Sequence, residues 1–433
     1  MTAETASVVI VGGGFAGVAA AKRLATDPQI RVDLVDRTGY HQFQPLLYQV
    51  ATAALTADDV RFDLARMFRG NPTVTVRKAQ ATAVDPVARS VTLDGGDTLT
   101  ADYIVLAAGA QANFFHTPGA QEHAFPLYSV EDALRVRGRV LSIFEDTARD
   151  PDLLRRGALN FVVVGGGPTG VETAGALAEL VHDVMPHVYH EVPPGHAHIL
   201  LVDAGHALLA AFSEQAHAYA DKQLQRRGVI LHQGVSVQEV TEDKVFLSDG
   251  AAIPTRLCIW GGGEQAAAIA GAAGVSRGRG GRIDVLPDLT VPGFPDLYAL
   301  GDIANIPFGD EHALPQLGSV AQQAGRWAAD NILARVRGEA ATPFHYRDKG
   351  IMAMIGRKAA VAEVGEHRHE MHGRLAFAAW LGVHAELLGN AGAELNAFVR
   401  WAEEFYLRPH HRAAALLEPS RVDTPRIDWE QKG

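Results

Sequence analysis

The chain has 433 residues, enough for two or three domains with substantial hydrophobic cores. Hydrophobic residues make up 47% of it and charged residues 21%, which is typical of a globular protein and not of a disordered one. The formal net charge of −11 argues against a nucleic-acid partner, because such partners favour a basic surface.

Cys258 is the sole cysteine, which excludes an internal disulfide, a dithiol relay and a cysteine metal cluster, and we expect no metal site. A reducing cytosol suits such a chain. The first residues lack the basic and apolar regions of a signal peptide. No uninterrupted run of about 18 apolar residues occurs, so we expect no membrane span and a cytoplasmic protein.

A buried parallel strand is predicted at Val8–Val11, because this run is apolar and lacks alternation. The glycine-rich turn Gly12–Gly17 follows, then an Ala-rich helix to about Ala25, then a strand at 31–35 that ends in Asp36. This order is the fingerprint of a dinucleotide site, and the alternative is a turn that serves only tight packing. The residues expected to bind FAD here are Gly12, Gly14, Phe15, Ala16, Gly17, Asp36 and Arg37.

A further buried strand is predicted at 103–106, running into Ala108 and Gly109. Ligands of parallel sheets bind beyond the carboxyl ends of the strands, so we expect Ala108 and Gly109 to contact FAD.

The same glycine turn recurs 153 residues after the first, at Gly165–Gly170, again between an apolar strand and a helix. This helix is predicted from about Thr169 through Leu180 and as far as Tyr189. The next strand, 199–202, ends in Asp203, whose carboxylate favours a free ribose hydroxyl and repels a 2′-phosphate. We therefore predict NADH and not NADPH, held by these residues: Gly165, Gly167, Pro168, Thr169, Gly170, Asp203 and Gly262.

Glu172 lies two residues past the second turn and has two interpretations. As an acid near a helix N-terminus it is stabilised by the helix dipole. Beside a nicotinamide it would take part in proton movement during the reaction.

An apolar strand at 297–300 ends in Gly301 and Asp302. Both residues are expected to bind FAD. Asp302 would accept hydrogen bonds from the ribityl chain, and its alternative role is an ordinary helix N-cap.

With both turns in view, the chain resembles the type II NADH dehydrogenases from Val8 to about Leu417. The most specific segments are Tyr40–Thr52, the Gly301–Asp302 pair and the segment Phe344–Arg357. These relatives are single-chain, FAD-containing NADH:quinone oxidoreductases that pump no protons. The resemblance implies a flavin contact for Gln44 and Leu46.

The resemblance also implies that Glu172 is near the nicotinamide and that Gln323 is at the quinone end of the flavin, and we count both as catalytic. Ser319 and Ala324 depart from glutamines that are frequent in the family, and Glu264 adds an acid near the cofactor cleft. These departures leave the residues expected for hydride transfer unchanged, but they leave the identity of the electron acceptor open.

Two amphipathic helices are predicted within residues 374–412, with basic residues around the second one. In the family this segment resembles a monotopic anchor in the membrane interface, which would place the protein on the cytoplasmic face of the inner membrane. The alternative is a pair of helices that packs domains or forms a homodimer, which the glutamates of this segment favour.

The expected fold is α/β, with two Rossmann-like domains and a C-terminal α+β segment. The FAD domain is predicted at 1–113 and 264–340, the NADH domain at 114–263 and the C-terminal domain at 341–433. The predicted reaction is hydride transfer from NADH and reduction of a quinone. The alternatives are an NADH-dependent flavin reductase with a soluble electron carrier and a slow-turnover, NADH-sensing flavoprotein.

Overall fold

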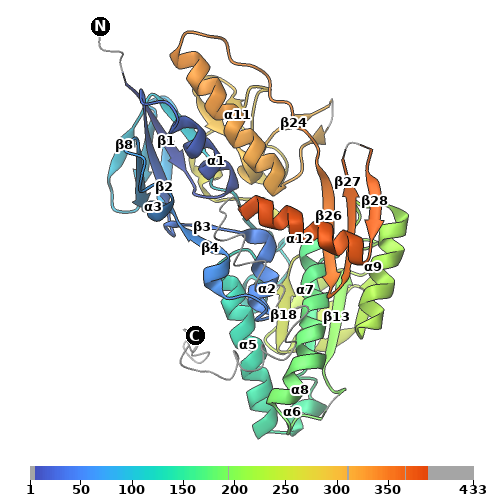
Figure 1. The fold of residues 1–433 in the computed structure, drawn as a ribbon. Helices are drawn as coiled ribbons and strands as arrows, with labels where there is room; N and C mark the ends of the chain where they lie inside the picture. The colour runs from blue at the N-terminus through green and yellow to red at the C-terminus, as the bar shows by residue number, and fades with distance from the viewer. Residues whose placement is uncertain (1–4, 194, 310–311, 366, 389–433) are drawn as a thin grey trace. The chain divides into compact units, whose positions relative to one another are not determined.

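The structure, a computed structural model, describes residues 5–193, 195–309, 312–365 and 367–388 (Figure 1). The chain divides into two compact units. The described residues within 1–42, 61–111 and 264–347 form unit 1, and those within 43–60, 112–263 and 348–388 form unit 2.

Unit 1 is built on a six-stranded sheet. Five of its strands run parallel, and β21 pairs antiparallel with β22 at one edge. In sheet order the strands are β21 (Thr290–Val291), β22 (Phe294–Ala299), β9 (Tyr103–Leu106), β1 (Ala6–Val11), β2 (Ile30–Asp36) and β5 (Val74–Lys78).

Helices α1 (Phe15–Leu24) and α11 (Gly318–Val336) pack against each other beside this sheet (Figure 1). They approach closely because Gly325 has no side chain, and a Cβ there would meet the carbonyl oxygen of Ala16. The remaining elements of unit 1 are β3 (Tyr40–Gln42), β4 (Arg61–Asp63), α3 (Leu64–Met67), β6 (Ala81–Asp85), β7 (Ser90–Leu93), β8 (Thr98–Thr100), α10 (Ile269–Ala272) and several shorter segments.

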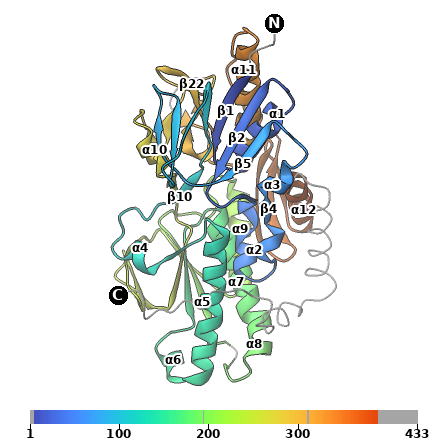
Figure 2. The same ribbon diagram turned by 90° about the vertical axis from the view of Figure 1, so that its left-hand side faces the viewer.

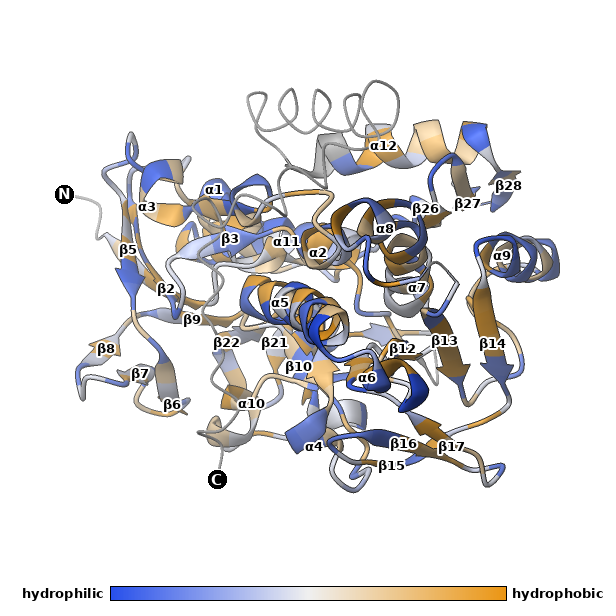
Figure 3. Cartoon of the chain, turned by 90° about the horizontal axis from the view of Figure 1, so that it is seen from below, coloured by the Kyte–Doolittle hydropathy of each residue, from blue (hydrophilic) through white to orange (hydrophobic). Residues whose placement is uncertain are grey.

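Unit 2 is built on a five-stranded parallel sheet. Its strands, in sheet order, are β11 (Phe125–Pro126), β18 (Leu257–Trp260), β12 (Asn160–Val164), β13 (His198–Asp203) and β14 (Val229–Gln233). Strand β13 is hydrophobic along most of its length (Figure 3), as expected for a strand buried on both faces.

Helix α5 (Val130–Arg149) is amphipathic, with hydrophobic and hydrophilic sides (Figure 3), and contacts α2 (Leu47–Ala51) (Figure 2). Helix α12 (Arg374–Leu388) lies across a three-stranded antiparallel sheet (Figure 1). That sheet consists of β26 (Gly350–Gly356), β27 (Ala359–Val364) and β28 (His369–His372). Unit 2 also contains α7 (Pro168–Glu179), α9 (Glu214–Arg226), β15 (Val237–Val240), β16 (Lys244–Leu247) and β17 (Ala252–Pro254).

The predicted strands at 8–11, 31–35, 103–106 and 199–202 are all confirmed, and so is the apolar strand predicted before Gly165. The helix predicted from about Thr169 through Leu180 is confirmed as α7, but its extension as one helix as far as Tyr189 is wrong. The α-helix ends at Glu179, a π-helical turn η3 (Leu180–Val184) follows, and the short helix α8 (Met185–Val188) completes the segment. Pro186 has no N–H to donate to residue 182, so a regular helical register cannot continue there.

The units group the chain differently from the three expected domains. Residues 43–60 and the described residues from 348 onward cluster with unit 2. The reason is packing: β26 lies on α7, and a Cβ at Gly175 of α7 would meet the carbonyl oxygen of Ile355. The second predicted amphipathic helix lies outside the described residues. Within the described part of the chain, no helix is long and apolar enough to cross a membrane.

Candidate active site

The first glycine turn has the backbone that a nucleotide phosphate requires. Gly12 adopts a φ of +110°, and a Cβ there would meet the carbonyl oxygen of Ala107, just after β9. A Cβ on Gly17 would likewise meet the carbonyl oxygen of Gly12. At Gly14 no atom of the described residues lies within 4 Å of the Cβ position. The turn therefore leaves open space directly before the N-terminus of α1, where phosphate groups bind.

Asp36 holds this turn in shape. Its Oδ2 accepts a hydrogen bond of 2.7 Å from the Gly13 amide. Its Oδ1 accepts from the Thr38 amide at 2.8 Å, the Thr38 hydroxyl at 2.7 Å and the Gly39 amide at 2.9 Å. The carboxylate thus organises the protein itself, and its expected contact with ribose stays a prediction.

Phe15 and Ala16 are buried in the first turn of α1. The Phe15 ring packs edge-on against His41 with 5.1 Å between ring centroids, and the His41 Nδ1 lies 2.9 Å from the Gly13 carbonyl oxygen. Phe15 therefore supports the turn from within unit 1, whereas Arg37 is exposed.

Asp302 carries an unused acceptor. It lies in the short turn η5 (Gly301–Ile303), whose N-cap residue is Leu300, so the N-cap alternative is wrong. Within the described part of the chain, the buried Oδ1 of Asp302 has no hydrogen-bond partner. Burial raises the pKa of Asp302 to about 6, although Arg282 opposes the shift. A buried oxygen without a donor fits a ligand that carries hydroxyl groups.

Two neighbouring features of unit 1 match the expected cofactor edge. Gly109 has a φ of +71°, just after β9, and Ala108 is half-buried. Glu264 is exposed overall, but desolvation of its carboxyl group, followed by the charge of Asp302, raises its pKa to about 7, so the unusual acid does lie near Asp302.

The second turn has nearly the same backbone geometry as the first. Gly165 has a φ of +108°, and a Cβ there would meet the carbonyl oxygen of Gly261, just after β18. A Cβ on Gly170 would meet the carbonyl oxygen of Gly165, and the Cβ position of Gly167 is open. Gly167, Pro168 and Thr169 are exposed at the N-terminus of α7, so its amides face a space that a dinucleotide can enter.

Asp203 follows β13 and lies against this turn. A Cβ on Gly166 would come within 2.5 Å of the Asp203 Oδ2, as Asp36 lies against Gly13 in the first turn. Asp203 thus lies against its turn as Asp36 does, and its expected contact with ribose stays a prediction. Gly262, expected to border the same site, is half-buried next to Trp260, whose Nε1 donates to the Asn113 carbonyl at 2.8 Å.

Glu172 is the most perturbed acid of unit 2. It lies on α7, is 8% exposed, and its Oε1 accepts a 2.9 Å hydrogen bond from the Met354 amide of β26. Burial raises the pKa of Glu172 to about 8, although the hydrogen bond from the Met354 amide and the nearby Trp380 side chain oppose the shift. Near neutral pH the carboxyl group is therefore protonated, so a simple helix-dipole role for a charged acid does not describe it.

Glu172 faces a small cavity, here called the inner cavity, which Tyr48, Gln49, Ala176, Glu179 and Met354 also line. About 10 Å³ of it is open to the centre of a water molecule, roughly enough for one water.

Side chains of α2 shape the wall of the inner cavity. The Tyr48 hydroxyl lies 3.3 Å from the Met354 Sδ, and the Gln49 Nε2 donates to that hydroxyl at 3.0 Å.

Trp380 and His384 of α12 form an aromatic wall in the same unit. Trp380 is fully buried, and its ring stacks on His384 with 4.0 Å between centroids. Burial lowers the pKa of His384 to about 4, so the imidazole is neutral at physiological pH. The sequence did not single out Tyr48, Met354 or Trp380 as neighbours of Glu172, because the contacts join segments far apart in the chain.

Gln323 is engaged within unit 1. Its Nε2 donates to the Arg347 carbonyl, and its Oε1 accepts from the Arg347 amide, both at 3.0 Å. Ser319 lies on the same helix as Gln323, and its hydroxyl is 2.9 Å from the hydroxyl of Tyr346 in the segment after the helix. These pairs brace the segment after α11, and the expected quinone contact of Gln323 stays a prediction.

The other expected flavin contacts differ in exposure. Gln44 is half-buried and Leu46 is fully buried, both in the 3₁₀ turn before α2.

The sequence and the fold are similar to those of known proteins. Residues 6–325 match the family model described as pyridine nucleotide-disulphide oxidoreductase. The type II NADH:quinone oxidoreductase Ndh of Mycobacterium tuberculosis is 33% identical over 413 residues, which cover 92% of this chain and 88% of that protein. The chain belongs to the type II NADH:quinone oxidoreductase family.

Solved structures share the fold of this type II NADH:quinone oxidoreductase family member. NDH2 from Plasmodium falciparum in complex with NADH superposes with a TM-score of 0.85 at 18% identity, covering 94% of this chain and 99% of that one. The sulfide:quinone oxidoreductase from Aquifex aeolicus gives a TM-score of 0.72 at 18% identity, covering 94% and 96%.

The lone thiol distinguishes this chain from flavoenzymes that work through paired cysteines. Cys258 lies in β18, is 3% exposed, and burial raises the pKa of its thiol to about 12. Such a thiol stays protonated and unreactive.

Proposed function

We propose that this chain oxidises NADH and reduces a quinone, with FAD as its resident cofactor. The observation that carries the proposal is the pair of equivalent glycine turns, each with a matching acid, together with a buried, protonated Glu172 beside the second turn. Family membership supports the same reaction.

The residues of the first turn fit FAD. The open position at Gly14 would admit the pyrophosphate, and the unpartnered Oδ1 of Asp302 would accept a hydrogen bond from the ribityl chain. When bound, FAD supplies the two-electron chemistry that connects NADH to the acceptor.

The second turn would hold NADH. The N-terminal amides of α7 would bind its pyrophosphate, and the carboxylate of Asp203 would accept from the adenosine ribose. A 2′-phosphate at this place would meet the Asp203 carboxylate without a compensating arginine in residues 204–206, which favours NADH over NADPH.

Glu172 would handle the proton. NADH delivers two electrons and one hydrogen as hydride, whereas a quinol carries two hydrogens, so each turnover takes one proton from solution. A carboxyl group with a pKa of about 8 holds a proton at neutral pH and releases it within reach of physiological conditions.

A soluble electron carrier is the second candidate acceptor. The observation that favours it is the bracing of Gln323 and the presence of Ser319 and Ala324 where relatives frequently carry glutamine. A carrier that accepts electrons alone would not need the proton of Glu172, so the protonated carboxyl favours quinone.

Double-mixing stopped-flow spectroscopy tests the reaction. The holoenzyme is first mixed anaerobically with NADH, and the loss of flavin absorbance is followed. It is then mixed with a menaquinone or ubiquinone analogue, or with an oxidised iron–sulfur protein. Fast recovery of the absorbance with quinone is expected. Recovery only with the iron–sulfur protein would assign the soluble acceptor, and slow recovery with every acceptor would favour the NADH-sensing role.

We further propose that the protein associates with the cytoplasmic face of the inner membrane and forms a homodimer. A peripheral enzyme meets a membrane quinone without spanning the bilayer, and the large apolar side chain of Leu375 on α12 is 76% exposed. Flotation with anionic vesicles tests the membrane association, and sedimentation velocity tests the homodimer. Protein that stays at the bottom of the gradient, or sediments as a monomer, would contradict the corresponding proposal.

A further inference from the structure

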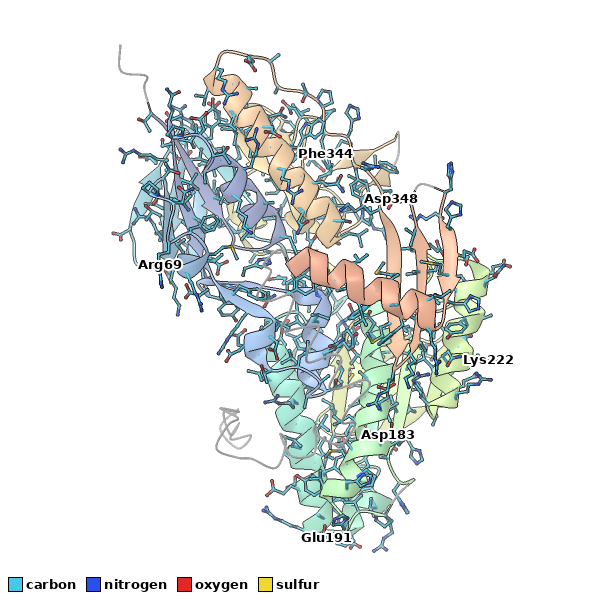
Figure 4. All side chains as sticks on the ribbon, in the orientation of Figure 1. Arg69, Asp183, Glu191, Lys222, Phe344 and Asp348 are labelled. Atoms are coloured by element: carbon cyan, nitrogen blue, oxygen red, sulfur yellow. The ribbon has the colours of Figure 1, made fainter. Side chains whose placement is uncertain are left out.

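A second, larger cavity lies in unit 2 and has no part in the chemistry described above. This outer cavity has a volume of about 740 Å³, and its polar lining includes Glu179, His182, Asp183, Tyr189, Arg226 and Arg227. Asp183, on the π-helical turn after α7 (Figure 4), and Arg226 are exposed, so the outer cavity reaches solvent.

Glu179 lines both cavities. It lies seven residues after Glu172 on α7, and Ala176 lies between them, so the three residues share one face of the helix. The small side chain of Ala176 leaves the inner cavity open between the two acids. The side chain of Glu179 is 10% exposed and forms part of the wall between the two cavities.

Among the described residues, hydrogen-bond donors contact only one oxygen of the Glu179 carboxylate. Its Oε1 accepts from the Arg357 amide at 2.5 Å and from the Arg227 Nε at 3.3 Å. Both of its hydrogen bonds within the described residues go to this oxygen, which leaves Oε2 for water. Gly356 makes the arrangement possible, because a Cβ there would come within 2.7 Å of the Glu179 Oε1.

We propose that Glu179 is the residue through which protons pass from the outer cavity to the inner cavity and Glu172. The inference rests on the proposed function, because only a hydrogen-accepting substrate such as quinone consumes a proton in each turnover. The carboxylate of Glu179 takes a proton from water in the outer cavity and gives it to water in the inner cavity. That water returns a proton to Glu172 after Glu172 has donated its own, so no electrons and no further reactant are needed.

The charged and titratable groups around this route are few. Glu172 lines the inner cavity with Tyr48 of α2, and Trp380 of α12 lies beside it. His384 stacks on Trp380. Glu179 is faced by Arg227 after α9 and by His182 and Asp183 from η3, with Arg226 and Tyr189 farther around the outer cavity. Among the residues that line the two cavities, Glu179 is the acid common to both.

The test replaces Glu179 with glutamine, which keeps the acceptor for Arg357 and Arg227 but carries no exchangeable acid. For E179Q we expect reduction by NADH at the wild-type rate and quinone turnover slowed about tenfold, within the usual range for a lost acid–base group. The loss should deepen as pH rises, because fewer protons reach Glu172. D183N, which removes an acid from the outer cavity alone, is the matched control and should keep the wild-type pH profile.

Chemical rescue separates proton transfer from a structural role. E179A opens the wall, so formate, a small weak acid, should raise its quinone turnover several-fold, with no such effect on D183N, and E179D should retain most activity. A wild-type pH profile in E179Q, or equal losses in E179D and E179Q without rescue by formate, would overturn the proposal. Wild-type enzyme that fails to reduce any quinone would instead overturn the proposed function.

Discussion

Burial decides the chemistry of Glu172. A carboxyl group in water loses its proton near pH 4.5, but the pKa of Glu172 is raised to about 8. The Met354 amide hydrogen-bonds Oε1 without restoring the normal pKa, because desolvation outweighs one neutral donor. The residue therefore holds a proton at neutral pH, close to the second glycine turn.

Replacing Glu172 with glutamine should abolish the decrease of quinone turnover at high pH. Quinone turnover by the wild type is expected to fall as pH rises through about 8, where Glu172 loses its proton. E172Q keeps the hydrogen bond from Met354 but cannot donate, so its turnover should be about tenfold or more slower at pH 7 and nearly flat between pH 7 and 9. Steady-state rates across this range check the prediction, and a wild-type limb retained in E172Q would contradict it.

Asp203 should set the preference between the two nicotinamide nucleotides. D203A is expected to raise the KM for NADH and to reduce the preference for NADH over NADPH about tenfold, because the repulsion of a 2′-phosphate is lost. The exposed acid Glu191 (Figure 4) offers a control in the same unit, since E191A removes one charge away from the turn. Unchanged discrimination in D203A would refute the role of Asp203.

Cys258 should resist thiol reagents in the native protein. Its raised pKa and its 3% exposure within β18 leave almost no thiolate at the surface. Alkylation with iodoacetamide, followed by mass spectrometry, should modify the denatured protein completely and the native protein hardly at all. Rapid native modification accompanied by loss of activity would contradict a mechanism without a thiol.

Among the elements, the two strand–turn–helix segments were predictable because their signal is local. The close contacts at Gly12, Gly17, Gly165 and Gly170 leave only glycine at those positions, so the sequence itself marks β1, α1, β12 and α7. The surroundings of Glu172 were not predictable in the same way. The amide that it accepts from belongs to Met354, 182 residues away, and no spacing rule connects the two.

The break in the helix after Glu179 was also missed, although Pro186 was visible in the sequence. A proline lowers the stability of a helix at a known place, but it does not say whether the chain ends, kinks or widens into a π-helical turn. α7 packs against β26 and α2, which belong to distant parts of the sequence, and no local pattern conveys such contacts.

Two substitutions in the second glycine turn should affect different properties, one the stability of the fold and the other the binding of NADH. G170A forces a Cβ onto the carbonyl oxygen of Gly165, so we expect it to lower the Tm by several degrees. G167A places its Cβ in open space, so it should keep the wild-type Tm but raise the KM for NADH about tenfold by obstructing the pyrophosphate. Thermal denaturation and NADH kinetics measure both effects, and the opposite pattern would contradict the assigned geometry.

At the scale of the whole molecule, each compact unit carries one glycine turn with a matching acid, Asp36 in unit 1 and Asp203 in unit 2. Unit 1 has the first turn and Asp302, whereas unit 2 has the second turn, Asp203, Glu172 and both cavities. The duplication explains why the sequence predicted two dinucleotides and the hydride reaction. The identity of the acceptor was expected to depend on Gln323, whose hydrogen bonds to Arg347 no motif predicts.

The most direct measurement is an anaerobic titration of the holoenzyme with NADH and a quinone analogue in weakly buffered solution containing a pH indicator. NADH should be consumed far beyond the amount of enzyme, with one quinol formed and one proton taken up for each NADH oxidised. NADH consumption that stops once the enzyme-bound cofactor is reduced, with no quinol formed and no further proton uptake, would contradict the account.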